Sequence, residues 1–247
     1  MALAFFVIYA IYALSRWRQY LTAGYDLGIF DQAVHHYAHF QAPLVPLKGD
    51  RYNILGDHFH PILAVLSPLY WIWDDPRMLL LAQAALVASS IPVVAGLFRR
   101  HLGYGRLPIL LTLCYALSWP IQRMVDFDFH EIAFGVPLLA VALDGLDRRD
   151  DRRLVVAGLL LLLVREDMGM ILAMLGLVRL LRGARTTELD GEAPLRGAEN
   201  NEGPCQHDVD KALRCGAGDG NRTRVSSLGS WRSTIELRPH AVRRGPV

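Results

Sequence analysis

Apolar runs alternate with short polar groups over the first 181 residues of the chain, and the alternation stops near Arg182. The clearest run, Met78 to Phe98, has twenty-one residues and no charge. A helix of that length can cross the apolar core of a bilayer, which is about 30 Å thick. The polar remainder shows neither a helical nor a strand period. The pattern predicts an all-α, polytopic helical membrane protein with a disordered, non-native tail over residues 186–247.

The other apolar runs are short for a span. The first, Leu3 to Leu14, covers only about 18 Å as a helix, so we expect the true start to lie upstream of Met1. A long polar outer loop is expected over residues 15–60, and an interfacial helix over 61–73, which contains Pro68 and ends in aromatic residues. A transmembrane domain of five or six spans is expected over residues 1–185, with the later spans at about 78–98, 107–121, 131–145, 154–165 and 168–182.

Arginines decide the predicted orientation. Ten of them lie in three groups, at 99–106, 148–153 and 179–185. All three groups fall on one side if the 61–73 segment is interfacial and Arg165-Glu166-Asp167 is a turn. The positive-inside rule makes that side cytoplasmic and puts the amino end inside. One continuous helix over 154–181 would instead leave three charges at mid-bilayer, each costing about 2.5–3.5 kcal/mol.

Composition supports the membrane class and narrows the partners. The chain is 52% hydrophobic and 20% charged, with a net charge of +2. So small a charge does not favour a nucleic-acid partner. The bilayer is the expected partner, and the expected location is multi-pass in the cell membrane. Three cysteines without a C-x-x-C pair predict neither a disulfide framework nor a cysteine metal site.

The predicted orientation places polar residues of four segments at the outer ends of the helices. Charge at that depth is expensive and usually functional. The first segment is Tyr25 to Phe40, in which Asp26 and Asp31 are five residues apart. The others contribute Asp57, His58, His60, Asp126, Asp128, His130, Glu131, Arg165, Glu166 and Asp167.

These segments resemble a known family. The stretches Y-D-L-G-I-F-D-Q, G-D-H-F-H-P-I-L, D-F-D-F-H-E-I-A-F and L-L-V-R-E-D-M-G are similar to a bacterial membrane family called domain of unknown function 2079, from about Ala23 to Arg182. That family distantly resembles the GT-C glycosyltransferases, among them the protein mannosyltransferases and the lipid A aminoarabinose transferases. The resemblance implies a GT-C-like N-terminal half that uses a polyprenyl-phosphate-linked sugar at the outer face.

The resemblance also implies particular residues. Asp26 or Asp31 matches the acidic motif after the first span, His60-Pro61 the start of a later segment, and Arg165 lies near a basic position. Two features depart from the GT-C pattern. The acidic motif is D-x-x-x-x-D rather than an adjacent pair, and GT-C enzymes have about a dozen spans, so only about half of their membrane part is represented.

Sugar transfer from a lipid phosphate needs a carboxylate base and positive charge for the departing phosphate. The expected base is Asp31 or Asp26, and the expected phosphate partner is Arg165 or Arg123. Further acidic candidates are Glu131 and Glu166. Structural alternatives remain open: the aspartates would cap or orient a short interfacial helix, and Arg165-Glu166-Asp167 would form an ion-pair network that holds a hairpin.

A divalent metal is the one cofactor that the residue types suggest. Asp57, His58, His60 and His130 are candidate ligands by type, although their spacing matches no metal motif. Hydrogen bonding between loop ends and a wet ion or proton pathway are the alternatives. Gln83, Ser89 and Ser90, in the clearest span, are expected to serve helix packing rather than substrate binding.

The tail changes how the whole chain is interpreted. Gly218 to His240 looks like translated antisense of a transfer-RNA gene, because Asn221 to Arg224 can be encoded by the complement of the T-arm sequence. On that hypothesis the reading frame leaves the membrane gene near Thr186 and the chain is a fragment. The leading functional hypothesis is a glycosyltransferase-like protein. The alternatives are a non-enzymatic transport or assembly protein and an inactive truncated fragment.

Overall fold

The structure is a computed structural model that describes residues 1–22 and 24–191. Most of the tail predicted to be disordered, residues 192–247, lies outside the described residues. The described part is all-α apart from one isolated bridge between Leu44 and Asn53. Its α-helices are α1 (Ala2–Arg18), α2 (Gly24–Ala38), α3 (Ser67–Ile72), α4 (Arg77–Leu102), α5 (Arg106–Ala116), α6 (Trp119–Asp126), α7 (Gly135–Arg148), α8 (Asp151–Leu162) and α9 (Met168–Gly191). Its 3-10 helices are η1 (Ile54–Gly56), η2 (Pro61–Leu66) and η3 (Glu131–Phe134).

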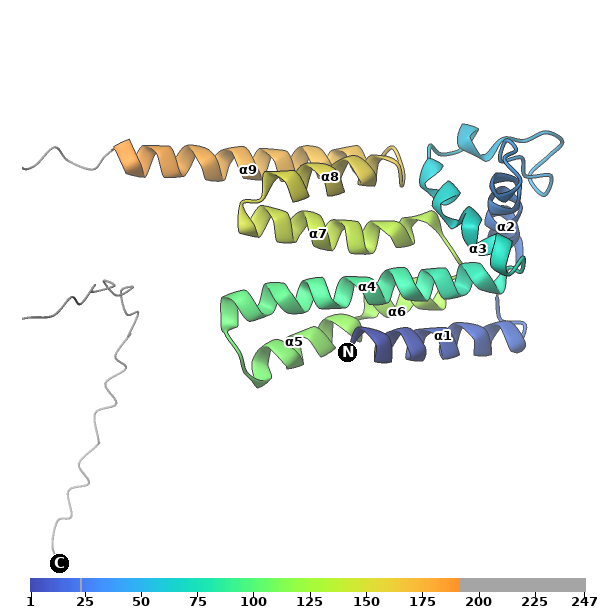
Figure 1. Cartoon of the computed structure of the whole chain (residues 1–247), viewed down its shortest axis with the longest axis horizontal. Coiled ribbons are helices and arrows are strands. Elements are labelled where there is room, and N and C mark those ends of the chain that lie inside the picture. Colours follow the sequence, from blue (N-terminus) through green and yellow to red (C-terminus); the bar gives the residue numbers. More distant parts are fainter. Residues whose placement is uncertain (23, 192–247) are drawn as a thin grey trace, which may run out of the picture. The chain divides into compact units, whose positions relative to one another are not determined.

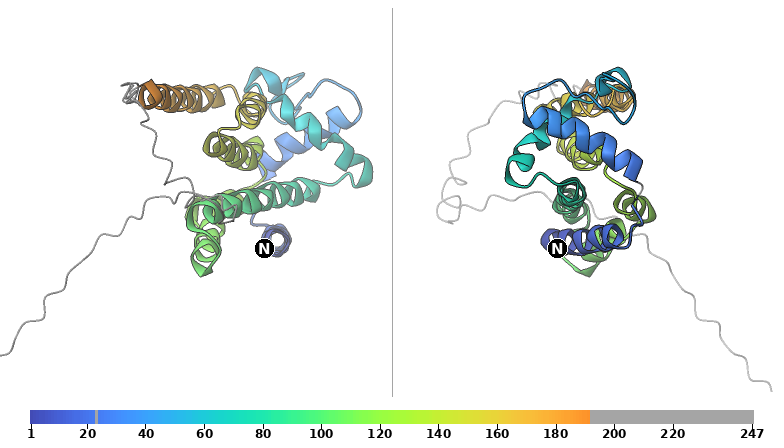
Figure 2. Two further views of the ribbon diagram at one scale, coloured as in Figure 1. Left: turned by 60° about the vertical axis from the view of Figure 1, so that its left-hand side comes forward. Right: turned by 90° about the vertical axis from the view of Figure 1, so that its right-hand side faces the viewer.

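The long helices form a row. Neighbours pack in the order α1, α4, α7, α8, α9, as Figure 1 shows from bottom to top. The α5–α6 pair packs against α4, and α6 also packs against α1. Helix α2 lies across one end of this row together with α3 and η2 (Figures 1 and 2). The end covered by α2 is named the loop end below.

Arginines gather at the opposite end, named the arginine end. Arg100, near the end of α4, binds Asp144 and Asp147 near the end of α7. Arg179 of α9 binds Asp151 in the first turn of α8, with Nε 2.6 Å from Oδ1. These ion pairs join α4 to α7 and α8 to α9.

One helix of the described part, α4, is long and apolar enough by itself to cross a membrane. Its 26 residues give a length of about 39 Å, which exceeds the apolar core of a bilayer. The apolar stretch Pro61–Ile72 is shorter, and the structure divides it into a 3-10 helix and the six-residue α3. The five or six predicted spans therefore remain a proposal.

The span predicted at 107–121 differs from the structure, where α5 and α6 are separate helices. Pro120 explains the break, because proline has no N–H to donate to the carbonyl four residues earlier, that of Ala116. The Tyr9 hydroxyl of α1 donates to that carbonyl instead, at 2.7 Å. The Gln122 side chain donates to the next carbonyl, Leu117, also at 2.7 Å. Side chains thus satisfy backbone groups that the broken helix leaves free.

The polar loop predicted over residues 15–60 contains the fifteen-residue helix α2. Its buried face carries Leu27, Phe30 and Val34, at the three- and four-residue spacing of an amphipathic helix. Asp26 lies in the first turn, where a carboxylate interacts favourably with the helix dipole. Sequence reasoning kept a short helix capped or oriented by Asp26 and Asp31 as one alternative. It did not predict the bounds of α2, because the histidines and aspartates between these apolar positions hid the period.

A close approach at Gly145 joins α7 to α8. A Cβ atom built there would lie 2.8 Å from the backbone nitrogen of Leu154 and 3.0 Å from the Arg153 Cβ. Both atoms belong to the first turns of α8, and backbone cannot move aside as a flexible side chain can. Gly145 therefore sets how tightly the α7–α8 hairpin closes.

We expect Gly145→Ala to destabilise the protein by about 1–3 kcal/mol, the usual cost of overpacking. Thermal unfolding of the purified protein in detergent measures the change. The matched control is Gly176→Ala in α9, because its added Cβ meets nothing within 4 Å. Alanine there should leave stability unchanged or raise it by up to about 1 kcal/mol. Equal melting temperatures for the two variants would contradict the packing argument.

Candidate functional site

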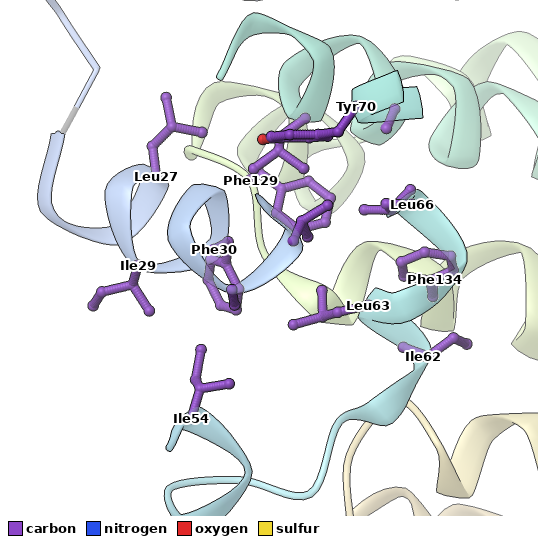
Figure 3. Close-up of a cluster of buried hydrophobic side chains, with 14 of the residues drawn as sticks. Leu27, Ile29, Phe30, Ile54, Ile62, Leu63, Leu66, Tyr70, Phe129 and Phe134 are labelled. Carbon is purple, nitrogen blue, oxygen red and sulfur yellow. The ribbon is translucent and has the colours of Figure 1, made fainter. Parts of the chain in front are cut away.

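The floor of the loop end is an apolar cluster contributed by several elements. Phe30 of α2, Leu63 of η2 and Phe134 of η3 belong to it, together with Phe129 from the segment before η3 (Figure 3). Phe129 and Leu63 are fully buried. Hydrophobic contact between α2, η2 and η3 therefore fixes the backbone from which the polar side chains of this end project.

A buried carboxylate lies beside this floor. Glu131, the first residue of η3, is 3% exposed, and its Oε1 is 3.8 Å from Nη1 of Arg165. Its Oε2 is buried and has no hydrogen-bond partner among the described residues. The neighbouring His60 is 2% exposed, and its Nδ1 is also buried without a partner in this part of the chain. Buried polar atoms are almost always hydrogen-bonded, so two unpartnered ones on adjacent segments mark a candidate binding site.

Aromatic contacts orient the two histidines around α2. The Phe30 ring makes an edge contact with His60 at 6.2 Å between ring centroids, and another with His130 at 5.2 Å. Burial lowers the pKa of His60, and the nearby Glu131 carboxylate opposes that shift only in part. His60 is therefore a neutral ring at neutral pH, able to donate or accept a hydrogen bond.

Gln83 of α4 positions the segment that leads into Glu131. Its Nε2 donates to the carbonyl of Met124 at 2.7 Å and to that of Phe127 at 3.0 Å. Its Oε1 accepts from the backbone N–H of His130 at 3.0 Å. Sequence reasoning assigned Gln83 to helix packing and missed this second role. The available signal was a lone glutamine in the middle of an otherwise apolar helix.

The turn between α8 and α9 contains Arg165, the positively charged residue beside Glu131. Arg165 donates to Oδ2 of Asp167 through Nε at 3.1 Å and Nη2 at 2.7 Å. Nη1 is the guanidinium nitrogen that lies toward Glu131. Arg165 thus holds an exposed carboxylate on one side and a buried one on the other. Sequence reasoning offered a site and an ion-pair network as alternatives for this turn, and the geometry contains elements of both.

Glu166 fastens the same turn to the segment before η2. Its Oε1 accepts from Nδ1 of His58 at 2.8 Å, and its Oε2 accepts from the backbone N–H of Phe59 at 2.9 Å. The backbone N–H of Ile62 donates to the Leu163 carbonyl at 3.1 Å. The bond from His58 is the largest cause, and the bond from Phe59 a further one, of a Glu166 pKa lowered to about 2. Glu166 thus joins two loops, and its two hydrogen bonds, from His58 and Phe59, are called the Glu166 clasp.

The two aspartates of the proposed acidic motif have different surroundings. Asp31 accepts a hydrogen bond from the Tyr70 hydroxyl of α3 at 2.7 Å. Burial raises the pKa of the Asp31 carboxyl more than this bond lowers it. Asp26 makes no hydrogen bond or ion pair with the described residues. Phe30 faces the histidines while Asp31 faces Tyr70, because successive helix residues point about 100° apart.

Two other acidic candidates are held in separate ion pairs. Asp126, at the end of α6, binds Arg16 of α1 at 2.8 Å and Arg123 at 2.8 Å, and accepts from the Tyr12 hydroxyl at 2.6 Å. Arg123, the second candidate for binding phosphate, therefore belongs to the α1–α6 contact. Asp57 pairs with Lys48 within the outer segment. Sequence reasoning gave no role to Tyr12 or Lys48, and it assigned Tyr70 to the aromatic belt at the end of the interfacial helix.

The four candidate metal ligands do not assemble. His58 is engaged by Glu166, Asp57 by Lys48, and the rings of His60 and His130 lie against Phe30. Within residues 1–22 and 24–191, no three His, Cys, Asp or Glu side chains are grouped as a metal site would require. The side chains of the described residues thus do not fit a metal.

Comparison with known proteins decides the family. Residues 16–200 match the family model described as predicted membrane protein (DUF2079). The chain belongs to the DUF2079 family. The match includes all four motifs from which the resemblance was inferred, and it identifies the protein as a membrane protein. Neither the curated proteins nor the solved structures contain a match to this DUF2079 chain.

The Glu166 clasp predicts a pH dependence. A carboxyl whose folded pKa of about 2 lies below its usual 4.5 adds stability that is fully present above about pH 4.5. That contribution is lost as the pH falls from there toward 2. We expect protection of the Phe59 amide against hydrogen exchange, corrected for the intrinsic rate, to hold from pH 7 to 5 and to decline below 4.5.

Two variants test the cause of this decline. Glu166→Gln should abolish the acid-dependent step, because an amide does not titrate there. Asp50→Asn is the matched control, since Asp50 is exposed and makes no ion pair in the described part of the chain. The Asp50→Asn variant should still lose protection of the Phe59 amide below about pH 4.5. A step that persists in Glu166→Gln would show that another group controls the loop.

Proposed function

We propose that the protein is a multi-pass membrane protein with a glycosyltransferase-like site at its loop end, where a polyprenyl-phosphate-linked sugar is the donor. The observation that carries the proposal is the buried Glu131 carboxylate, with one oxygen unpartnered and Arg165 at 3.8 Å. A buried carboxylate with a part-exposed guanidinium beside it matches two requirements of this transfer, a base and positive charge for the departing phosphate.

Each residue has a role in the proposed reaction. The Glu131 carboxylate accepts the proton of the acceptor hydroxyl as that oxygen bonds to the sugar. The bond between the sugar and the phosphate breaks, and the polyprenyl phosphate leaves with the bonding electrons. Arg165 stabilises the negative charge on the departing phosphate. Neutral His60, with its free Nδ1, orients a hydroxyl of the sugar or the acceptor.

Asp31 and Asp26 are the alternative bases, as the family resemblance implies. Asp31 is half-buried and already bonded to Tyr70, and its raised pKa favours proton transfer near neutral pH. Glu131 is preferred because Arg165 lies beside it, whereas the ion pairs and hydrogen bonds of the described residues put no arginine on Asp31. The substitutions below distinguish these carboxylates.

The proposed topology has the loop end outside and the arginine end in the cytoplasm. Its support is that the arginine groups of α4, the α7–α8 turn and α9 gather at the end opposite α2. The positive-inside rule makes such an end cytoplasmic. Helices shorter than the bilayer core are accommodated when flanking residues reach the interface or the bilayer thins.

Labelling of single cysteines with a membrane-impermeant maleimide in intact cells tests this topology. In a background with the native cysteines changed to serine, cysteine at Asp50 or Asp167 should react. Cysteine at Tyr104 or Arg149 should react only after the membrane is opened. All four positions are exposed in the structure. If the cysteines introduced at Asp50 and Asp167 react from opposite sides of the membrane, a single outer site is ruled out.

We expect Glu131→Gln to lower transfer by about 10²–10⁴, the usual contribution of a general base. Release of polyprenyl phosphate from undecaprenyl-phosphate hexose in membrane vesicles measures it. Arg165→Gln should lower transfer by about 10²–10³. Asp50→Asn is the control for loss of an outer-segment carboxylate and should retain activity.

The result for Asp31→Asn decides between the carboxylates. If Asp31→Asn abolishes transfer while folded Glu131→Gln retains it, Asp31 is the base and the assignment of Glu131 is wrong. If Glu131→Gln, Asp31→Asn and Asp26→Asn all fold and leave both transfer and surface glycans unchanged, the enzymatic proposal fails. A non-enzymatic transport or assembly role would then explain the ion pairs at the loop end.

A further inference from the structure

The arginine end contains two adjoining hollows along α4, α7 and α8. The first, of about 360 Å³, has Pro92 and Val93 of α4 and Arg148 of α7 in its wall. The second, of about 510 Å³, has Leu138 of α7 and Val156 and Leu160 of α8 in its wall, with Arg152 at its polar side. Val141 and Arg153 line both, so the two form one groove.

The apolar and charged residues of this groove are separated along its length. Val156 is 51% exposed and Leu160 is 38% exposed, and both lie along α8 from the second turn onward. Arg152 and Arg153 lie in the first turn of the same helix. Asp144 and Asp150 line the hollows at the same end, and both are paired with arginines. A ligand that fills the groove therefore meets apolar side chains along the bundle and, at its end, ion-paired carboxylates together with arginines.

Positive charge exceeds negative charge around the groove. The Asp144 carboxylate has a side-chain exposure of 7% and is shared by Arg148 at 2.9 Å, Arg153 at 3.0 Å and Arg100. Arg152 makes no ion pair or hydrogen bond within the described part of the chain. Across residues 99–106, 144–153, 179 and 182, nine arginines face four aspartates. Arg153 also pairs with Asp150, at 3.1 Å. Of the arginines that line the groove, Arg152 is therefore the one that the described carboxylates leave free for an anion.

We propose that this groove binds the phosphate headgroup of an anionic phospholipid, with Arg152 on the phosphate and an acyl chain along Val156 and Leu160. Basic pockets between helices at a cytoplasmic membrane face are suited to such headgroups. The apolar wall distinguishes a lipid from a free phosphate ion, which would gain nothing from it. The inference uses the membrane orientation proposed above but does not depend on transferase activity.

Thermal unfolding of the full chain in a neutral detergent, titrated with phosphatidylglycerol or phosphatidylcholine, tests the proposal. Phosphatidylglycerol should raise the melting temperature with a saturable dependence, because a ligand of the folded state stabilises it. Phosphatidylcholine should not. Arg152→Gln should raise the half-saturating phosphatidylglycerol concentration about fivefold, the effect of losing one arginine near an anionic headgroup.

Arg149→Gln is the matched control. It removes the same charge three positions away, and Arg149 lines neither hollow. The proposal is supported if Arg149→Gln has the half-saturating phosphatidylglycerol concentration of the wild type while that of Arg152→Gln is raised. An equal rise in both variants would overturn it in favour of a diffuse charge effect. Stabilisation by inorganic phosphate with the same Arg152 dependence would overturn the lipid assignment. The absence of any phosphatidylglycerol-specific shift would overturn the proposal as a whole.

Discussion

A carboxylate removed from water must be compensated by positive charge or by several hydrogen-bond donors, and the bundle meets this requirement differently at its two ends. At the arginine end, Asp144 is surrounded by three guanidinium groups that join α4, α7 and α8. At the loop end, Glu131 has one guanidinium at 3.8 Å and an oxygen without a partner. The compensated carboxylate holds helices together, whereas the undercompensated one is the group on which the proposed function rests.

The elements around Glu131 explain how such a group persists. Apolar packing of Phe30, Leu63 and Phe134 encloses the site, and Gln83 holds the backbone that leads into it. Their burial supplies stability that offsets the cost of the unpartnered atoms. The Glu166 clasp joins the α8–α9 turn to the segment before η2, so it also keeps Arg165 beside Glu131. Loss of the clasp would loosen the positive side of the site before its apolar floor.

Some local sequence patterns predicted the structure better than others. The membrane class and the α-helical content followed from the length of the apolar runs, because a helix of twenty-one uncharged residues is long enough to cross the apolar core of a bilayer. The break at Pro120 was visible in the sequence as a proline, yet the prediction passed over it. The bounds of helix α2 were not predicted, because its apolar stripe is interrupted by polar residues that the structure uses for contacts at the loop end. The grouping of arginines at one end was foreseen, since topology depends on charge between runs rather than on packing.

The sequence alone determined the family, the membrane class and the set of polar residues from which a site could be built. It could not determine which of them meet, because those contacts join residues far apart in the chain. Asp57, His58, His60 and His130 looked alike as ligands, and only tertiary packing gave them different partners. Likewise, the sequence favoured Asp31 or Asp26 as the base over Glu131, and only the fold showed that Glu131 is buried beside Arg165 while Asp31 is joined to Tyr70. The physical reason is that burial and pairing set the energy of a charge, and both are properties of the folded chain.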